Sequence, residues 1–151
     1  MIRNLIIIIG AMAALLFGAN AMAQGNHVAH CDGASEVPPF DTQGQCQAIF
    51  KVRNGNLSYK LNGANLMNVV AAHIHCAPVG ANGPVGVTLF GGAPVTVTGT
   101  LAQGPILAPD ANNGCGWFDL DDVLDAIATG DTYVNIHTLQ SLSGEVRGQI
   151  R

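Results

Sequence analysis

The sequence predicts a mainly β fold, an antiparallel β-sandwich or barrel of about seven short strands with one short helix. Segments that alternate apolar and polar residues recur along the chain, and turn residues such as Asn-Gly and Pro-Pro separate them. The chain carries 19 glycines, and only 11% of its residues are charged. That composition suits short strands and tight turns. A single stretch, near residues 119–129, has helical spacing instead.

The N-terminus predicts export. Met1–Arg3 supplies a small positive region, residues 5–17 an apolar core, and Ala21-Met22-Ala23 a small-residue cleavage signal. The apolar core is shorter than the roughly 20 residues of a membrane span. Residues 1–23 are therefore predicted to be a removed signal peptide, rather than a retained anchor, and the protein to be periplasmic or secreted. The remaining chain is long enough for one domain, expected at residues 28–151.

Net charge excludes some partners. Without Arg3, the chain keeps five basic and ten acidic residues and has no basic run. A mildly acidic protein of this kind is not expected to bind nucleic acid or an anionic membrane. The expected partners are an extracytoplasmic protein or a metal ion, and no membrane span is expected after cleavage.

The four cysteines follow the signal segment. An even number in an oxidising compartment predicts two disulfides, for which three connectivities exist. We favour Cys31–Cys46, which would bridge a hairpin containing Pro38-Pro39, and Cys76–Cys115, which would tie a strand end to the turn at residues 112–116. A cysteine-rich zinc site is the alternative, but the chain has no Cys-x-x-Cys pair.

The elements follow from local pattern. Residues 24–30 are expected to be a flexible polar leader that includes His27 and His30. Alternating patterns predict strands at residues 44–52, 57–61, 70–76, 85–90, 95–101, 133–138 and 144–150. Asn54-Gly55-Asn56 predicts a hairpin turn, and residues 62–65 predict another. The long connection at 104–116 is expected to be tied by Cys115.

The helix has a clear beginning and end. Asp119 is a suitable N-cap and Gly130 a suitable C-terminal glycine. Asp121 and Asp122 lie in its first turn, where the helix dipole favours negative side chains. An acidic cluster of this kind can also bind Ca²⁺, which is the alternative interpretation. The apolar positions fall at i, i+3, i+4 and i+7, namely Leu120, Val123, Leu124 and Ile127.

Two histidines mark a candidate site. Because side chains alternate along a strand, His73 and His75 share one face. His137 would join them if its strand lay alongside, and three imidazoles with an open position are typical of zinc or copper sites. The alternative is a structural polar face in which the histidines bond to Asn135, Glu145 or the backbone. An ion pair between Glu36 and Arg147 is expected to hold the proline turn against the last strand.

Five motifs together resemble the CHRD domain, which is named after chordin and also occurs in single-domain exported bacterial proteins. They are Gly33–Pro39, Ala71–His75, Gly80–Pro84, Tyr133–Thr138 and Gly144–Gln149. The resemblance implies an extracytoplasmic β-rich module and no particular enzymatic activity. This chain has one copy where chordin has several, and the Cys76 and Cys115 pair looks like a local addition. The growth-factor antagonism of chordin is therefore not carried over.

Three functional classes remain at this stage. The favoured one is an exported binding module, with His73, His75 and His137 as candidate ligands of zinc or copper. The second is a structural or adhesive envelope module without metal. The third is a redox enzyme of the copper–zinc superoxide dismutase type, which needs more ligands than these three. No catalytic motif is present in the sequence, so an enzyme is not expected.

Overall fold

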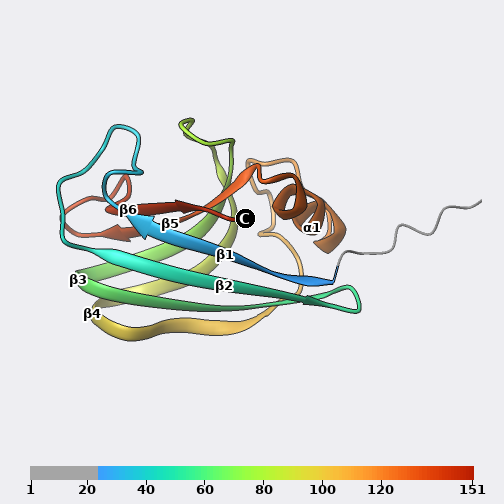
Figure 1. The fold of residues 1–151 in the computed structure, drawn as a ribbon, viewed down its shortest axis with the longest axis horizontal. Helices are drawn as coiled ribbons and strands as arrows, with labels where there is room; N and C mark the ends of the chain where they lie inside the picture. Colours follow the sequence, from blue (N-terminus) through green and yellow to red (C-terminus); the bar gives the residue numbers. More distant parts are fainter. Residues whose placement is uncertain (1–23) are drawn as a thin grey trace, which may run out of the picture.

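The computed structural model describes residues 24–151, so the predicted signal peptide lies outside the described residues. The fold class is confirmed: the described chain is mainly β, antiparallel, and has one short helix (Figure 1). No helix within residues 24–151 is both long and apolar enough to cross a bilayer. The elements are β1 (Gly25–Asp32), β2 (Gln45–Arg53), β3 (Asn56–Cys76), β4 (Val85–Ile106), α1 (Leu120–Thr129), β5 (Thr132–Thr138) and β6 (Val146–Gln149).

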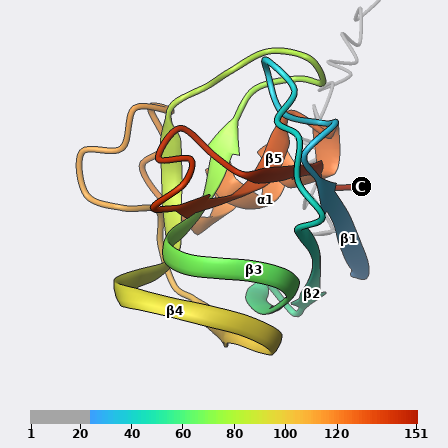
Figure 2. The same cartoon turned by 90° about the vertical axis from the view of Figure 1, so that its left-hand side faces the viewer.

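The strands close into a barrel. The hydrogen-bonded order is β2-β1-β6-β5-β3-β4, and β2 also pairs with β3. This second pairing closes β2, β1, β6, β5 and β3 into a ring of five strands, and β4 lies outside the ring against β3. The view along the strands shows this curled arrangement, with β4 as the outermost strand (Figure 2).

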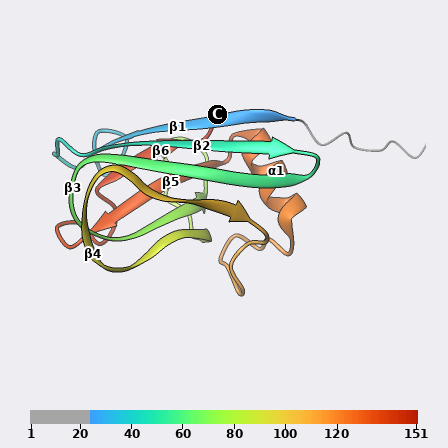
Figure 3. The same cartoon turned by 90° about the horizontal axis from the view of Figure 1, so that it is seen from below.

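Two long bent strands replace four of the predicted short ones. β3 pairs with β2 through residues 56–64 and with β5 through residues 69–76, and β4 follows β3 along both halves. The predicted turn at residues 62–65 is instead an irregular stretch where the register shifts, with Asn65 and Asn68 at positive φ. Such irregularities bend a strand without ending it. Both strands therefore turn through the same corner (Figure 3).

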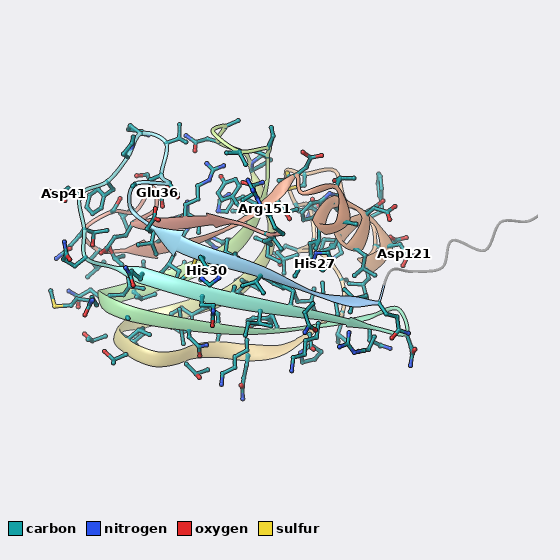
Figure 4. All side chains as sticks on the ribbon, in the orientation of Figure 1. His27, His30, Glu36, Asp41, Asp121 and Arg151 are labelled. Carbon is teal, nitrogen blue, oxygen red and sulfur yellow. A yellow bond between two sulfur atoms is a disulfide. The ribbon has the colours of Figure 1, made fainter. Side chains whose placement is uncertain are left out.

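The flexible leader was a wrong prediction. Residues 25–32 form β1, which pairs with β2 along its whole length and buries Ala29 and Cys31. His27 and His30 lie along this strand (Figure 4). A short segment with only two small inward residues carries little apolar signal, and its pairing with β2 supplies the order.

Two disulfides staple the barrel. Cys31 lies opposite Cys46 in the β1–β2 register and bonds to it, as expected. Cys76, at the end of β3, bonds to Cys115 in the connection before α1. The second disulfide therefore fixes the end of the histidine strand.

One strand is buried on both faces. All seven residues of β5 are buried, the apolar ones Val134 and Ile136 in the barrel core. Its other face carries Tyr133, Asn135 and His137, and loops cover it. A polar face covered in this way must satisfy its hydrogen-bonding groups internally.

Candidate metal centre

Strand register brings the three predicted histidines together. Ala72 and Ile74 of β3 point into the core, so His73 and His75 point to the opposite face. Across the β3–β5 pairing, His73 lies opposite Asn135, and His137 lies two pairs further along, opposite Ala71. The predicted cluster on one sheet face is therefore present.

The imidazole rings are close neighbours. Ring centroids are 4.9 Å apart for His73 and His137, 5.6 Å for His73 and His75, and 5.7 Å for His75 and His137. One ligand nitrogen from each ring lies within 4.8 Å of the other two. Metal–nitrogen bonds of about 2.0–2.1 Å require nitrogens roughly 3.3–3.6 Å apart in tetrahedral or trigonal geometry. A shared ion would therefore require the ligand nitrogens to lie closer together than the 4.8 Å limit.

Backbone carbonyls fix two of the rings. His75 Nδ1 lies 2.9 Å from the Gly83 carbonyl oxygen, and His137 Nδ1 lies 3.0 Å from that of Leu142. A carbonyl only accepts, so each Nδ1 carries the proton and donates it. The Nε2 atoms of both rings are then unprotonated, with lone pairs free for a metal. Such outer contacts orient the histidine ligands of metal sites.

Three buried nitrogens of the cluster have no hydrogen-bond partner among the residues that the structure describes. They are Nδ1 of His73 and Nε2 of His75 and His137. Each ring thus presents one unsatisfied nitrogen within the cluster. Unpartnered buried polar atoms are rare in native proteins, and each needs a specific explanation.

The histidines are neutral at neutral pH. Burial, and next the neighbouring His137, lower the pKa of His73 to about 4. Burial also lowers the pKa of His75 to about 4, against the opposing Gly83 hydrogen bond. Burial lowers the pKa of His137 as well. The neutral imidazole is the form that binds metals.

Arg147 holds the loop at residues 77–84, which connects β3 to β4. Its guanidinium donates to the Ala81 carbonyl oxygen at 2.7 Å, to Asn82 Oδ1 at 3.2 Å and to the Pro78 carbonyl oxygen at 3.4 Å. The predicted ion pair between Glu36 and Arg147 was therefore wrong in its partner, because three neutral oxygens take the guanidinium N–H groups. The loop thus held carries Gly83, which orients His75.

Tyr133 links Arg147 to the histidines. The Arg147 guanidinium carbon lies 3.5 Å from the centroid of the Tyr133 ring. Tyr133 in turn stacks on His75, with centroids 4.8 Å apart and planes 9° apart. Tyr133 is not among the residues predicted for the site, although the alternation of residues 133–137 places it on the same face as His137.

The remaining polar residues do not bond to the histidines. Asn135 Nδ2 donates to Glu36 Oε2 at 3.3 Å. Glu145, 2% exposed, accepts hydrogen bonds from the Thr42 and Thr138 hydroxyls at 2.7 and 2.6 Å. The alternative prediction was a structural polar face in which the histidines bond to Asn135, Glu145 or the backbone. Of these bonds, only those to the backbone are present, and only for His75 and His137.

Comparison with known proteins identifies the family. No match was found among curated proteins or among solved structures. The family model for the CHRD domain matches residues 28–150, nearly all of the described chain. The match includes β3 with His73 and His75, the loops at residues 77–84 and 139–145, and the last two strands, β5 and β6. The chain therefore belongs to the CHRD domain family.

Proposed function

We propose that this protein is an exported binding module that holds one transition-metal ion, zinc or copper, through His73, His75 and His137. The observation that carries the proposal has two parts. Each of the three histidines buries one ring nitrogen without a hydrogen-bond partner among residues 24–151, and each offers one ligand atom within 4.8 Å of those of the other two. Three neutral imidazoles form the first shell of many zinc and copper sites.

The energetics favour a ligand over a structural polar cluster. A buried polar atom without a partner costs about 1–3 kcal/mol. Three such atoms side by side are a sizeable cost for a domain whose net stability is about 5–15 kcal/mol. A bound metal would satisfy all three at once, and the carbonyls of Gly83 and Leu142 already hold two rings in the required tautomer.

Two further observations support the rest of the proposal. Paired disulfides persist in oxidising compartments, which agrees with export. The ligand residues of the cluster are three histidines, and the sequence contains no catalytic motif around them. Binding is therefore proposed rather than an enzymatic reaction.

The test is metal binding by wild type and a matched pair of variants. Zn²⁺ and Cu²⁺ are titrated by calorimetry, and bound metal is measured by elemental analysis after desalting. We expect one ion per wild-type chain and a loss of at least about 100-fold in affinity for His75→Ala, since a ligand is removed. His30→Ala, at an exposed histidine of β1, is the control and should bind as wild type does. Equal, weak binding by all three proteins would refute the proposal.

A further inference from the structure

The electrostatic surroundings of the three histidines distinguish between metal ions of different charge. The ligand nitrogens are buried, and the ligand set carries no charge of its own, because all three members are imidazoles. Other zinc sites include a carboxylate or thiolate ligand, whose negative charge offsets part of the charge of the ion. Because no ligand here is negatively charged, only the groups around the cluster can offset the charge of a bound ion.

One buried charge next to the cluster is positive, and it adds to burial in lowering the pKa of His75. Arg147 is 2% exposed, and its guanidinium bonds only to neutral oxygens. It reaches His75 through one intervening ring, that of Tyr133. A cation stacked behind a ligand ring disfavours further positive charge at the cluster.

The three carboxylates around the cluster compensate poorly. Glu36 contacts Asn135, not a histidine, and burial raises its pKa to about 7, so much of it is neutral near that pH. Glu145 is engaged by two threonine hydroxyls. Asp110 faces His73 from the β4 side, but it is partly exposed, and both its oxygens accept hydrogen bonds from Thr88.

From this balance we infer that the site holds copper as the monovalent ion, in preference to Zn²⁺ and Cu²⁺. The inference rests on the proposed function. The desolvation cost of an ion rises with the square of its charge, so a divalent ion costs about four times as much as a monovalent one of similar size. Three nitrogens also complete a trigonal shell for Cu⁺, whereas Zn²⁺ and Cu²⁺ require further ligands.

The experiment compares affinities for three ions under conditions that keep the disulfides intact. Cu⁺ is supplied without oxygen, with ascorbate as reductant and bathocuproine disulfonate as competitor. Zn²⁺ and Cu²⁺ are measured against chromophoric chelators of known affinity. We expect the Kd for Cu⁺ to lie at least about tenfold below the other two, which corresponds to about 1.4 kcal/mol.

A designed carboxylate tests the electrostatic cause. Ala71 is partly exposed, lies on the face of His73 and sits opposite His137. Ala71→Asp adds a negative charge there, and Ala71→Asn is a neutral control of the same shape. Asp is expected to lower the preference for Cu⁺ by about tenfold relative to Asn, because a carboxylate favours the extra charge of a divalent ion.

The outcomes separate the two proposals. Binding of no ion would refute the proposed function, and this inference with it. Zn²⁺ or Cu²⁺ bound as tightly as Cu⁺ by wild type would overturn the inference and leave the metal site standing. An equal preference in Ala71→Asp and Ala71→Asn would also overturn it, because charge would then not set the selectivity.

Discussion

At the scale of single residues, protonation decides how the polar face of β5 is satisfied. Glu36 Oε1 and Asn135 Oδ1 are both buried without a hydrogen-bond partner, and both lie within 3 Å of the position where a Cβ on Gly144 would stand. Two acceptors cannot bond to each other, but a protonated carboxyl can donate. Burial, opposed by Arg147, raises the pKa of Glu36 to about 7, which favours that proton.

The raised pKa predicts a pH-dependent effect of Glu36→Gln. The folded-state pKa of about 7 exceeds the ordinary 4.5, so this group's contribution to stability is full below pH 4.5 and is lost as pH rises through 7. Glutamine cannot ionise and offers an N–H to Asn135. We expect Glu36→Gln to be more stable than wild type at pH 8 by about 1 kcal/mol, with a smaller gap at pH 5.

Urea unfolding at the two pH values measures this effect. The histidines act in the opposite direction, because their lowered pKa values reduce stability as pH falls from about 6.5 to about 4. They do so in both proteins, so the comparison cancels them. Asp41→Asn, at an exposed carboxylate before β2, should stay within about 0.5 kcal/mol of wild type at both pH values. A gap independent of pH for Glu36→Gln would show that Glu36 is ionised throughout.

At the scale of elements, residues close in sequence determine where the helix begins and ends, whereas distant strands determine the course of the long strands. Asp119 caps α1 by accepting from the backbone N–H of Asp121 and Asp122, and Gly130 ends it in the left-handed conformation. Asp122 also accepts from the Phe118 backbone N–H, which gives the first turn a reciprocal cap. The acidic first turn is thus accounted for by capping and the helix dipole.

Removal of the cap predicts a specific loss of stability. Asp119→Ala leaves two N–H groups without their acceptor and is expected to cost about 1 kcal/mol in chemical denaturation. Asp125→Ala, at an exposed position inside the same helix, removes an equal charge without a cap. That control should cost less than about 0.5 kcal/mol. Equal losses for the two variants would assign the effect to net charge.

At the scale of the whole molecule, closure of the barrel depends on the approach of β1 to β6. The two strands meet at the pairing of Asp32 with Arg147. At the next residue, Gly148, an added Cβ would lie 2.3 Å from the His30 carbonyl oxygen. Backbone atoms cannot move aside as side chains can, so the closure requires glycine there.

Gly148→Ala is therefore expected to destabilise the protein by about 1–3 kcal/mol, the range typical of overpacking. Gly104→Ala in β4 is the matched control, because nothing lies within 4 Å of its added Cβ. Thermal and urea unfolding compare the two variants. A loss for Gly148→Ala no larger than that for Gly104→Ala would show that β1 can move away from β6 at little cost.

The corner shared by β3 and β4 marks a limit of sequence reasoning. Asparagine and glycine at residues 62–65 are typical of turns, and locally nothing distinguishes a turn from an irregular strand. β3 pairs with β2 up to residue 64 and with β5 from residue 69, and β4 pairs with it before and after the corner. These pairings keep the chain extended across this stretch. The contacts that decide the outcome come from strands distant in sequence.

Features that depend on short-range chemistry could be predicted from the sequence. Alternation of apolar and polar residues predicted the β class and placed His73 and His75 on one face. Capping residues predicted α1, and the even number of cysteines predicted two disulfides. The tertiary structure alone decided which strands became neighbours. Register across β3 and β5 brought His137 to the pair, and the loops of Gly83 and Leu142 supplied the carbonyls that orient the rings. Arg147 and Tyr133 joined the site in the same way, because contacts between distant segments depend on how the whole barrel closes.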